Sequence, residues 1–160
     1  MFKHIFLAGI VTVILAACAG PVAKGPKYAP IDALDEYALV YVYRPYANDG
    51  VTLCMKFLIN NEMNGCLNNL GFLKAKIRPG KHEVALQTNT FMGPKIVAFE
   101  GSFEAGSVYF YRYYTTNDSK TIPSDAVSTR YIPAFNATHV LTPKSLEEAE
   151  LELKHLFESI

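Results

Sequence analysis

Tyr-Ala-Leu-Val-Tyr-Val-Tyr-Arg, the stretch from residue 37 to residue 44, carries aliphatic and aromatic side chains at both alternating sets of positions. Successive side chains of a strand point to opposite faces of its sheet, so both faces of this stretch would be largely apolar. Strands that are covered on both sides have this pattern. The stretch therefore predicts a buried central strand, with the rest of the fold arranged around it.

Further short runs of strand-favouring residues follow, and Asn, Gly and Pro separate them. Asn60-Asn61-Glu62 is one such separation, and in Arg78-Pro79-Gly80-Lys81 the proline and glycine suit a type II turn. Turn signals about every 8–12 residues are typical of a β-sandwich or a small barrel. We assign residues 36–141 to this mainly β domain. The predicted strands after the first cover residues 52–59, 63–67, 72–77, 82–87, 95–100 and 107–115.

The C-terminal residues change to a helical pattern. Thr142 followed by Pro143 suits a helix start, and so does a capping box formed by Ser145 and Glu148. Both starts remain open. Within residues 142–160 we predict an amphipathic C-terminal helix that packs on the domain. Its apolar positions are Leu146, Ala149, Leu153, Leu156 or Phe157, and Ile160.

Residues 1–17 have the layout of a signal peptide. Lys3 and His4 make a charged start, and an apolar stretch follows that is shorter than the roughly 20 residues a transmembrane helix needs. The stretch ends in Leu-Ala-Ala-Cys18, which resembles the bacterial lipobox at every position. We therefore predict cleavage before Cys18 and acylation of its thiol. The alternative is an ordinary secretory signal in which the cysteine occurs by chance.

Residues 18–35 are predicted to form a flexible tether between the lipid and the domain, because Gly and Pro punctuate them. The membrane is then a partner through the N-terminal lipid alone. Ala19 follows the acylated cysteine, at the position where Asp is associated with retention at the inner membrane. We therefore expect attachment to the outer membrane, on its periplasmic face, in a host with two membranes.

Charge and residue spacing exclude several classes of function. The chain carries 15 basic and 15 acidic residues, so it has no electrostatic basis for a nucleic-acid partner. His82, His139 and His155 show no metal-ligand spacing, and no cysteine pair has CxxC spacing. The sequence therefore predicts no metal site and no cofactor.

No set of residues indicates catalysis. Ser124, Asp125 and His139 are the residue types of a hydrolase triad, but no GxSxG motif accompanies them. We therefore predict that the protein is not an enzyme. Arg44 and Arg112 lie within strand-favouring runs, where a structural ion pair is the favoured role and an anionic ligand the alternative.

Tyrosines are concentrated in two predicted strands. Tyr109, Tyr111 and Tyr113 alternate and share one face of their strand, and Tyr41 and Tyr43 form a second stripe. If the two strands are neighbours, the five rings would form a flat ligand platform for a glycan or a peptide. The alternative, favoured by the strand preference of tyrosine, is that the rings only stabilise the sheet.

Cys54 and Cys66 are the cysteines that remain after acylation, in an oxidising compartment. A hairpin with the three-residue turn 59–61 would place them directly opposite each other, within reach of a disulfide. A two-residue turn would instead place Cys54 opposite Leu67, with the two sulfurs on different faces. We favour the disulfide, and the alternative is two small buried side chains that never meet.

Four motifs follow one another along the chain: Tyr41-Val42-Tyr43-Arg44-Pro45, Phe57-Leu58-Ile59, Asn64-Gly65-Cys66-Leu67 and Ile77-Arg78-Pro79-Gly80-Lys81-His82. Their order resembles that of a known family. Over roughly residues 38–116 the chain is similar to small bacterial lipoproteins that carry a domain of unknown function. The resemblance implies an immunoglobulin- or transthyretin-like β-sandwich and brings no catalytic residues. The chain departs from the family pattern in its two cysteines and at Asn60 and Asn61, where an Asp-Gly turn is common.

These features favour a membrane-anchored envelope lipoprotein that acts as a non-enzymatic binding or structural module, with an envelope protein or a glycan as partner. Two alternatives remain. One is a small cell-envelope hydrolase acting on peptidoglycan or esters, for which a concave site with converging polar groups is expected. The other is a subunit of a larger envelope assembly, whose exposed sheet edge pairs with a partner strand.

Overall fold

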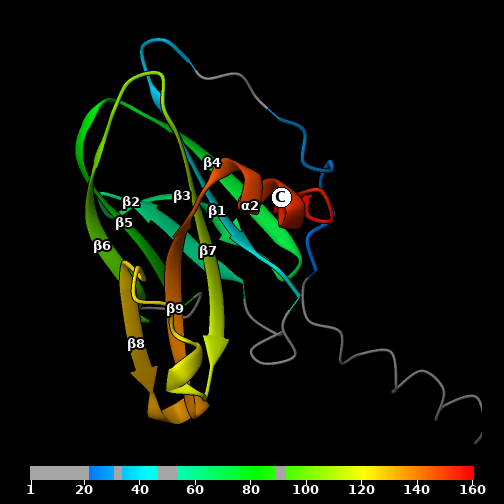
Figure 1. Ribbon diagram of the computed structural model, residues 1–160, viewed down its shortest axis with the longest axis vertical. Helices are drawn as coiled ribbons and strands as arrows, with labels where there is room; N and C mark the ends of the chain where they lie inside the picture. The colour runs from blue at the N-terminus through cyan, green and yellow to red at the C-terminus, as the bar shows by residue number, and fades with distance from the viewer. Residues whose placement is uncertain (1–21, 31–33, 47–53, 89–92) are drawn as a thin grey trace, which may run out of the picture.

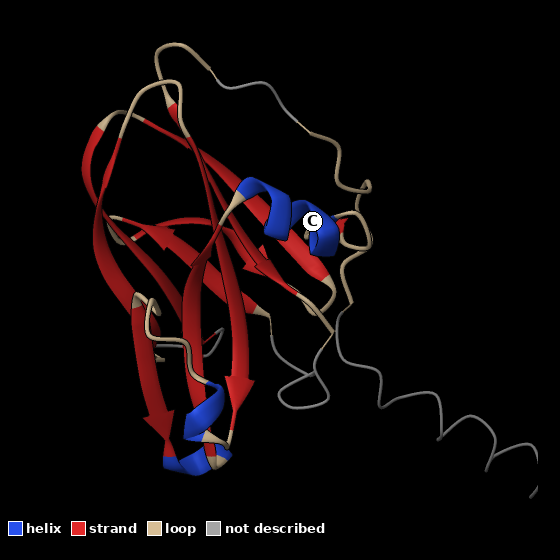
Figure 2. Cartoon of the chain, in the orientation of Figure 1, coloured by secondary structure: helices blue, strands red, loops and turns tan. Residues whose placement is uncertain are grey.

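In the computed structural model, two β-sheets pack face to face (Figure 1). The structure describes residues 22–30, 34–46, 54–88 and 93–160. Within these ranges the chain is mainly β with one short α-helix near its C-terminus, which confirms the predicted β-sandwich (Figure 2). No helix of the described ranges is long and apolar enough to cross a membrane. The predicted signal peptide, Cys18 and the first residues of the predicted strand 52–59 lie outside them.

The larger sheet has six strands in the order β10-β4-β1-β7-β9-β8. β1 lies near its middle, antiparallel to β4 and parallel to β7. Every residue of β1 is buried, as the pattern of residues 37–44 predicts. The strands of this sheet are β1 (Ala38–Arg44), β4 (Gly71–Ile77), β7 (Val108–Thr116), β8 (Ser128–Ile132), β9 (Ala137–Lys144) and β10 (Phe157–Glu158).

β8 and β9 were not predicted from the sequence. β9 pairs with β7 on one side and with β8 on the other, and its last residues include Thr142 and Pro143. These two residues have the types that begin a helix, but here their local preference is overridden by pairing with β7. Long-range pairing of this kind leaves little trace in a single stretch of sequence.

The smaller sheet is antiparallel throughout, in the order β3-β2-β5-β6. Asn60 and Asn61 form a two-residue turn between its first two strands, and their φ angles are 51° and 68°. Asn tolerates this left-handed conformation better than most residues, and such turns suit the twist of a hairpin. The strands are β2 (Met55–Ile59), β3 (Glu62–Leu67), β5 (Gly80–Thr88) and β6 (Lys95–Phe103).

The main hydrophobic cluster lies between the two sheets, and we call it the inner core. Val40 and Val42 of β1 share it with Phe57 of β2, and all three side chains are fully buried. Tyr111 and Tyr113 of β7 enter the same cluster. Burial of these apolar surfaces against each other is the main force that holds the two sheets together.

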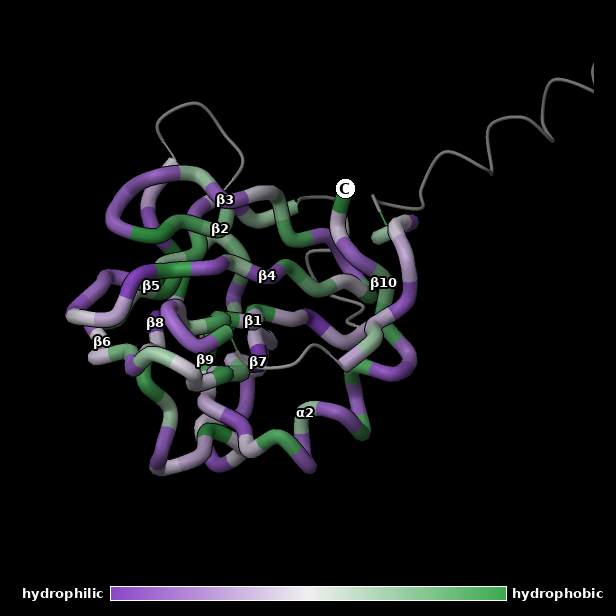
Figure 3. Tube along the Cα trace, turned by 90° about the horizontal axis from the view of Figure 1, so that it is seen from above, coloured by the Kyte–Doolittle hydropathy of each residue, from purple (hydrophilic) through white to green (hydrophobic). Residues whose placement is uncertain are grey.

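A second cluster covers the opposite face of the six-stranded sheet, and we call it the outer layer. The helix α2 (Leu146–Leu153) lies outside β7, on the side away from β5 and β6 (Figure 3). The buried residues of the helix pack on aromatic side chains of β1, β4 and β7. The buried members of the outer layer are Leu39, Tyr41, Tyr43, Phe72, Phe110, Ala149, Leu153 and Leu156.

The helix is shorter than predicted. It begins after Ser145, whose side chain accepts a hydrogen bond from the backbone N–H of Glu148, while the Glu148 carboxylate accepts one from the backbone N–H of Ser145. The alternative start at Thr142 and Pro143 is wrong, because both residues belong to β9. The helix ends at Leu153 instead of continuing toward the C-terminus.

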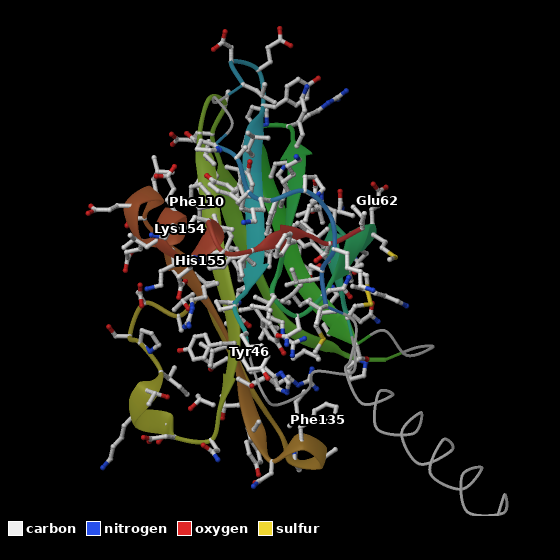
Figure 4. The ribbon with its side chains drawn as sticks, turned by 90° about the vertical axis from the view of Figure 1, so that its right-hand side faces the viewer. Tyr46, Glu62, Phe110, Phe135, Lys154 and His155 are labelled. Carbon is white, nitrogen blue, oxygen red and sulfur yellow. A yellow bond between two sulfur atoms is a disulfide. The ribbon has the colours of Figure 1, made fainter. Side chains whose placement is uncertain are left out.

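After the helix the chain returns to the sheet edge. Phe157 and Glu158 form β10, parallel to β4, so residues 154–160 are not helical. Leu146 and Ile160, predicted on the packed stripe, are 56% and 86% exposed. Figure 4 labels the exposed Lys154 and His155 at the point where the helix ends. Pairing with β4 satisfies the backbone of β10, which a helix pattern alone does not anticipate.

The predicted flexible tether is wrong over residues 22–28, which lie against the same sheet edge. Val22 forms an isolated bridge with Asn69, and Lys27 forms one with Phe157. The edge of a sheet presents unpaired backbone groups, and this segment pairs with them. Its glycines and prolines therefore belong to a docked segment.

Candidate functional site

A disulfide joins Cys54, just before β2, to Cys66 in β3, with 5.4 Å between their Cα atoms. The register that brings them together differs from the predicted three-residue turn. The turn has two residues, and Leu58 pairs with Met63. Beyond that pair a β-bulge shifts the register, so that Lys56 pairs with Cys66. The two cysteines are therefore diagonal neighbours on one face of the hairpin.

Gly65 makes the bulge possible. Its φ angle is 134°, a conformation that side chains other than glycine rarely adopt. A Cβ atom at this position would also lie 2.9 Å from Cδ2 of Leu73. A two-residue turn without a bulge would place Cys54 and Cys66 on different faces of the hairpin. The bulge adds one residue to β3 and so brings both cysteines to the same face.

The structure places the predicted tyrosine stripes on opposite faces of one sheet. β1 and β7 are neighbours, as the platform required, but Tyr41 pairs with Phe110 and Val42 pairs with Tyr111. Residues that pair directly point to the same face. Tyr41 therefore faces the outer layer and Tyr111 faces the inner core, so the five rings do not form a single platform.

Burial also removes the tyrosines from the surface. Tyr41, Tyr43, Tyr111 and Tyr113 are each at most 7% exposed. Tyr109 is half-buried, and its ring lies 4.9 Å from that of Phe103 in an edge-on contact. These rings stabilise the two clusters through aromatic packing.

A buried polar cluster lies at one end of the inner core. The Tyr113 hydroxyl lies 2.7 Å from Nδ1 of His139, and the Arg44 guanidinium lies 5.7 Å from the centre of the Tyr113 ring. Arg44 and His139 are 1% and 3% exposed. Burial, and then the charges of Arg44 and Arg130, lower the pKa of His139 to about 4. The imidazole is therefore neutral at neutral pH and has no access to a substrate.

His139 is consequently not part of a catalytic triad with the two residues considered beside it. Ser124 and Asp125 are exposed on the loop before β8, whereas His139 is buried and engaged by Tyr113. Among the described residues, no group of three or more His, Cys, Asp and Glu side chains is arranged to bind a metal ion.

A groove of about 350 Å³ lies between α2 and the strands β7 and β9, and we call it the α2 groove. It is a concave feature in which polar side chains converge from several elements. Strand β7 contributes an arginine, β9 a lysine, and α2 two glutamates and a leucine. The lining residues are Arg112, Lys144, Glu148, Leu151 and Glu152.

Ion pairs organise the walls of the α2 groove. Arg112 Nε lies 3.0 Å from Glu152 Oε1, as an ion pair without an aligned hydrogen bond. Tyr43, from below, donates a 2.8 Å hydrogen bond to the other oxygen of Glu152. Lys144 at the end of β9 forms an ion pair with Glu148, four residues later in α2, with 3.0 Å between Nζ and Oε1. Each charged group therefore holds a fixed position at the groove.

The protonation states of two groups at the groove follow from their contacts. Hydrogen bonds from the backbone N–H of Ser145, from Lys144 and from the Ser145 side chain lower the pKa of Glu148 to about 2. Burial, and then the hydrogen bond to Glu152, raise the pKa of the Tyr43 hydroxyl well above its ordinary value. At neutral pH Glu148 is an anionic acceptor, and Tyr43 remains a protonated donor.

One family model matches the chain. Its description is "Protein of unknown function (DUF2846)", and it covers residues 35–126, which is more than half of the sequence. The chain belongs to the DUF2846 family. No curated protein and no solved structure matches the chain.

The DUF2846 match includes only part of the lining of the α2 groove. It covers β1 to β7, including Tyr43, Arg112 and the disulfide, and it ends before β8. Lys144, Glu148 and Glu152 come from the C-terminal part of the chain, outside the match. The groove thus forms where the DUF2846 segment meets the segment that follows it.

The α2 groove was not predicted from the sequence. Arg112 was considered for an ion pair, but its partner Glu152 belongs to the helix that packs over the sheet. One signal was available, because Glu148 and Glu152 are four residues apart and share a helix face. That spacing does not show which strand the face would cover.

Proposed function

We propose that the chain is a lipid-anchored protein of the bacterial envelope whose folded domain is a non-enzymatic binding or structural module. Cys18 carries the lipid, and the domain faces the periplasm from the outer membrane. The support for the anchor is Leu-Ala-Ala-Cys18 behind a short apolar stretch. Membership of the DUF2846 family adds no activity, since that family has no described function.

The observation that carries the binding function is the α2 groove. It offers a guanidinium, a carboxylate with a pKa near 2 and an ammonium at fixed positions. Hydrogen bonds to charged groups are stronger than those between neutral groups, so such a wall suits a polar ligand. Leu151, which lines the groove and is 60% exposed, adds an apolar contact. A glycan or a peptide segment of an envelope protein has this mixed chemistry.

The same groups are poorly suited to hydrolysis. General acid–base catalysis is most effective when the catalytic group has a pKa near the working pH. At the α2 groove the pKa of Glu148 is shifted down to about 2 and that of Tyr43 is shifted upward, both away from neutrality. This favours binding over the alternative of a hydrolase for peptidoglycan or esters.

The anchor is tested by replacing Cys18 with serine. We expect Cys18→Ser to be lost from the outer-membrane fraction of a sucrose gradient. The intact mass of the protein with its natural Cys18 is expected to include acyl chains. Recovery of the protein with its natural Cys18 in the inner-membrane fraction would contradict the proposed location. A mass without acyl chains would contradict the anchor itself.

The binding site is tested by photo-crosslinking in intact cells. A photoreactive amino acid at Leu151 is expected to give a defined crosslinked product, whether protein or glycan. The same group at Glu62, which lies on β3 away from α2 (Figure 4), is the matched exposed control. Arg112→Ala should reduce the Leu151 product, and Lys154→Ala, at the exposed end of the helix, should not. Equal patterns from both positions would argue against the groove.

The absence of catalysis is tested separately. Purified protein is incubated with peptidoglycan and with ester substrates, and turnover is measured. Turnover that one point substitution abolishes would show that the protein is an enzyme.

A further inference from the structure

Residues 22–28 are held to the edge of the six-stranded sheet by backbone hydrogen bonds. The N–H of Ala23 donates to the carbonyl of Asn69 at 3.0 Å, and the N–H of Gly25 donates to that of Glu158 at 2.9 Å. In the other direction, the N–H of Glu158 donates to the carbonyl of Pro26 at 2.8 Å. These bonds satisfy backbone groups that would otherwise face solvent at a sheet edge.

Part of this segment also packs closely against the domain. Ala23 is 3% exposed, and a Cβ atom added to Gly25 would lie 2.5 Å from the carbonyl oxygen of Glu158. The ring of Tyr28 makes an edge-on contact with the ring of Tyr41, with 5.9 Å between the centroids. A segment packed in this way cannot act as a spacer.

The position of Cys18 in the sequence then limits how far the domain can lie from a lipid. Cys18 precedes Val22 by four positions. A fully extended chain covers at most about 3.6 Å per residue, so the Cα atoms of these two residues are within about 14 Å of each other. An acylated cysteine lies at the membrane surface. Val22 and its bridge partner Asn69 must then lie close to the headgroups.

We propose that the domain rests directly on the lipid surface, with one corner of the six-stranded sheet against the headgroups. This corner, which we call the membrane corner, consists of residues 22–24, 68–69 and 159–160. The N–H of Asn68 donates a 3.0 Å hydrogen bond to Oγ of Ser159, which joins the turn before β4 to the C-terminus. The proposal rests on the lipid at Cys18 and adds the orientation of the domain.

The opposite end of the sheet then points into the periplasm. Residues 78–79 form the turn between β4 and β5, seven or more positions from Gly71 at the start of β4. At about 3.3 Å per strand residue, this turn lies roughly 25 Å from the membrane corner. The two ends of β4 therefore differ enough in depth to be distinguished by fluorescence.

The orientation is tested with single tryptophans, because the natural chain contains none. Ile160→Trp places a fluorescence donor at the membrane corner, and Lys81→Trp places one beside the far turn. Both positions are exposed. Each lipidated full-length product is purified from membranes and reconstituted into phosphatidylethanolamine–phosphatidylglycerol vesicles with dansyl-labelled headgroups. We expect several-fold stronger energy transfer from Ile160→Trp than from Lys81→Trp. Equal transfer from the two positions would overturn the proposal.

The role of the docked segment is tested by releasing it. Gly25→Val in the Ile160→Trp protein introduces the clash with Glu158, and we expect energy transfer to fall several-fold. Ala29→Val, at an exposed position outside both residues 22–28 and the membrane corner, is the matched control and should keep the transfer unchanged. A long Gly-Ser insertion after Ala19 gives the same test without touching the domain. Unchanged transfer in the insertion variant would overturn the proposal.

Failure of the anchor and failure of the orientation give different results. The intact mass of the purified protein reports acylation directly. If acyl chains are absent, the anchor is refuted, and the orientation is measured after coupling the Cys18 thiol to a maleimide phospholipid. This coupling is selective, because Cys54 and Cys66 are joined in the disulfide.

Discussion

The inner core and the outer layer cover the two faces of one sheet with very different parts of the chain. The inner core is closed by a complete second sheet, whose strands pair along long antiparallel ladders. The outer layer is closed by three short pieces, which are residues 22–28, α2 and β10. These pieces come from the two ends of the described chain.

This difference separates stability from function. A short covering piece contributes few contacts for the conformational entropy it loses on docking, so the outer layer is the first region expected to open. The inner core supplies most of the apolar burial and sets the global stability. Both proposed functional features, the α2 groove and the membrane corner, lie on the outer layer, where opening and rearrangement require the least free energy.

The largest effect is expected in the inner core. Phe57 is fully buried between the sheets, and Phe57→Ala should lower the free energy of unfolding by about 3–5 kcal/mol, because it removes apolar contacts and leaves a cavity. Urea denaturation followed by circular dichroism measures the change. Leu151→Ala, at a 60% exposed position, is the control and should stay within about 0.5 kcal/mol of the natural chain.

A matched truncation in the outer layer should cost less and act locally. Leu153, the last residue of α2, is fully buried against the sheet, and Leu153→Ala should lower the free energy of unfolding by about 2–3 kcal/mol. Limited proteolysis should cut residues 22–30 and α2 before the sandwich unfolds. Simultaneous loss of both layers at the same protease concentration would show that the outer layer is as cooperative as the inner core.

Acid should act on the inner core through His139. Its pKa is about 4 in the folded protein, against an ordinary value near 6.5, so the unfolded chain binds more protons between these two values. Stability should therefore fall as the pH is lowered from about 6.5 to about 4, by about 1–3 kcal/mol. Urea denaturation at a series of pH values measures this loss. His139→Phe should remove it, and a slope unchanged by the substitution would assign it to other groups.

The smallest effect is expected at the start of α2. Ser145→Ala removes the side chain that accepts the backbone N–H of Glu148, and should destabilise the protein by about 1 kcal/mol. Ser145→Asp keeps an acceptor at the same place and serves as the control. Hydrogen exchange of the first amides of the helix should rise in Ser145→Ala, while exchange in β1 and β5 stays unchanged. Equal exchange in the two variants would mean that the cap does not hold this helix end.

Several features followed from local sequence because their physics is local. The nearly continuous apolar run of residues 37–44 describes a strand covered on both sides, wherever its neighbours lie. Ser145 and Glu148 form a capping box within one turn, so three residues of spacing are enough to predict it. The place of the turn at Asn60 and Asn61 is likewise local, but its length was predicted wrongly, because a three-residue turn was expected and the turn has two residues.

The candidate site depends on pairings between distant segments, and these were decided only by the tertiary structure. The parallel register of β1 and β7 sends Tyr41 outward and Tyr111 inward, and a shift by one residue would place both on the same face. The bulge at Gly65 decides that Cys54 and Cys66 share a face. Both outcomes depend on alignment between strands, which alternation within one strand does not specify.

The two ends of the chain show the same limit. Glycines and prolines in residues 22–28 predict a flexible linker, and residues 154–160 continue a helical pattern. Each segment instead pairs with an edge of the sheet. This pairing gives hydrogen-bond partners to backbone groups of the edge that would otherwise have none. The sequence determined which segments favour strand, turn or helix, since those preferences are local. The fold alone decided which edges were left to pair, and therefore where the groove and the membrane corner lie.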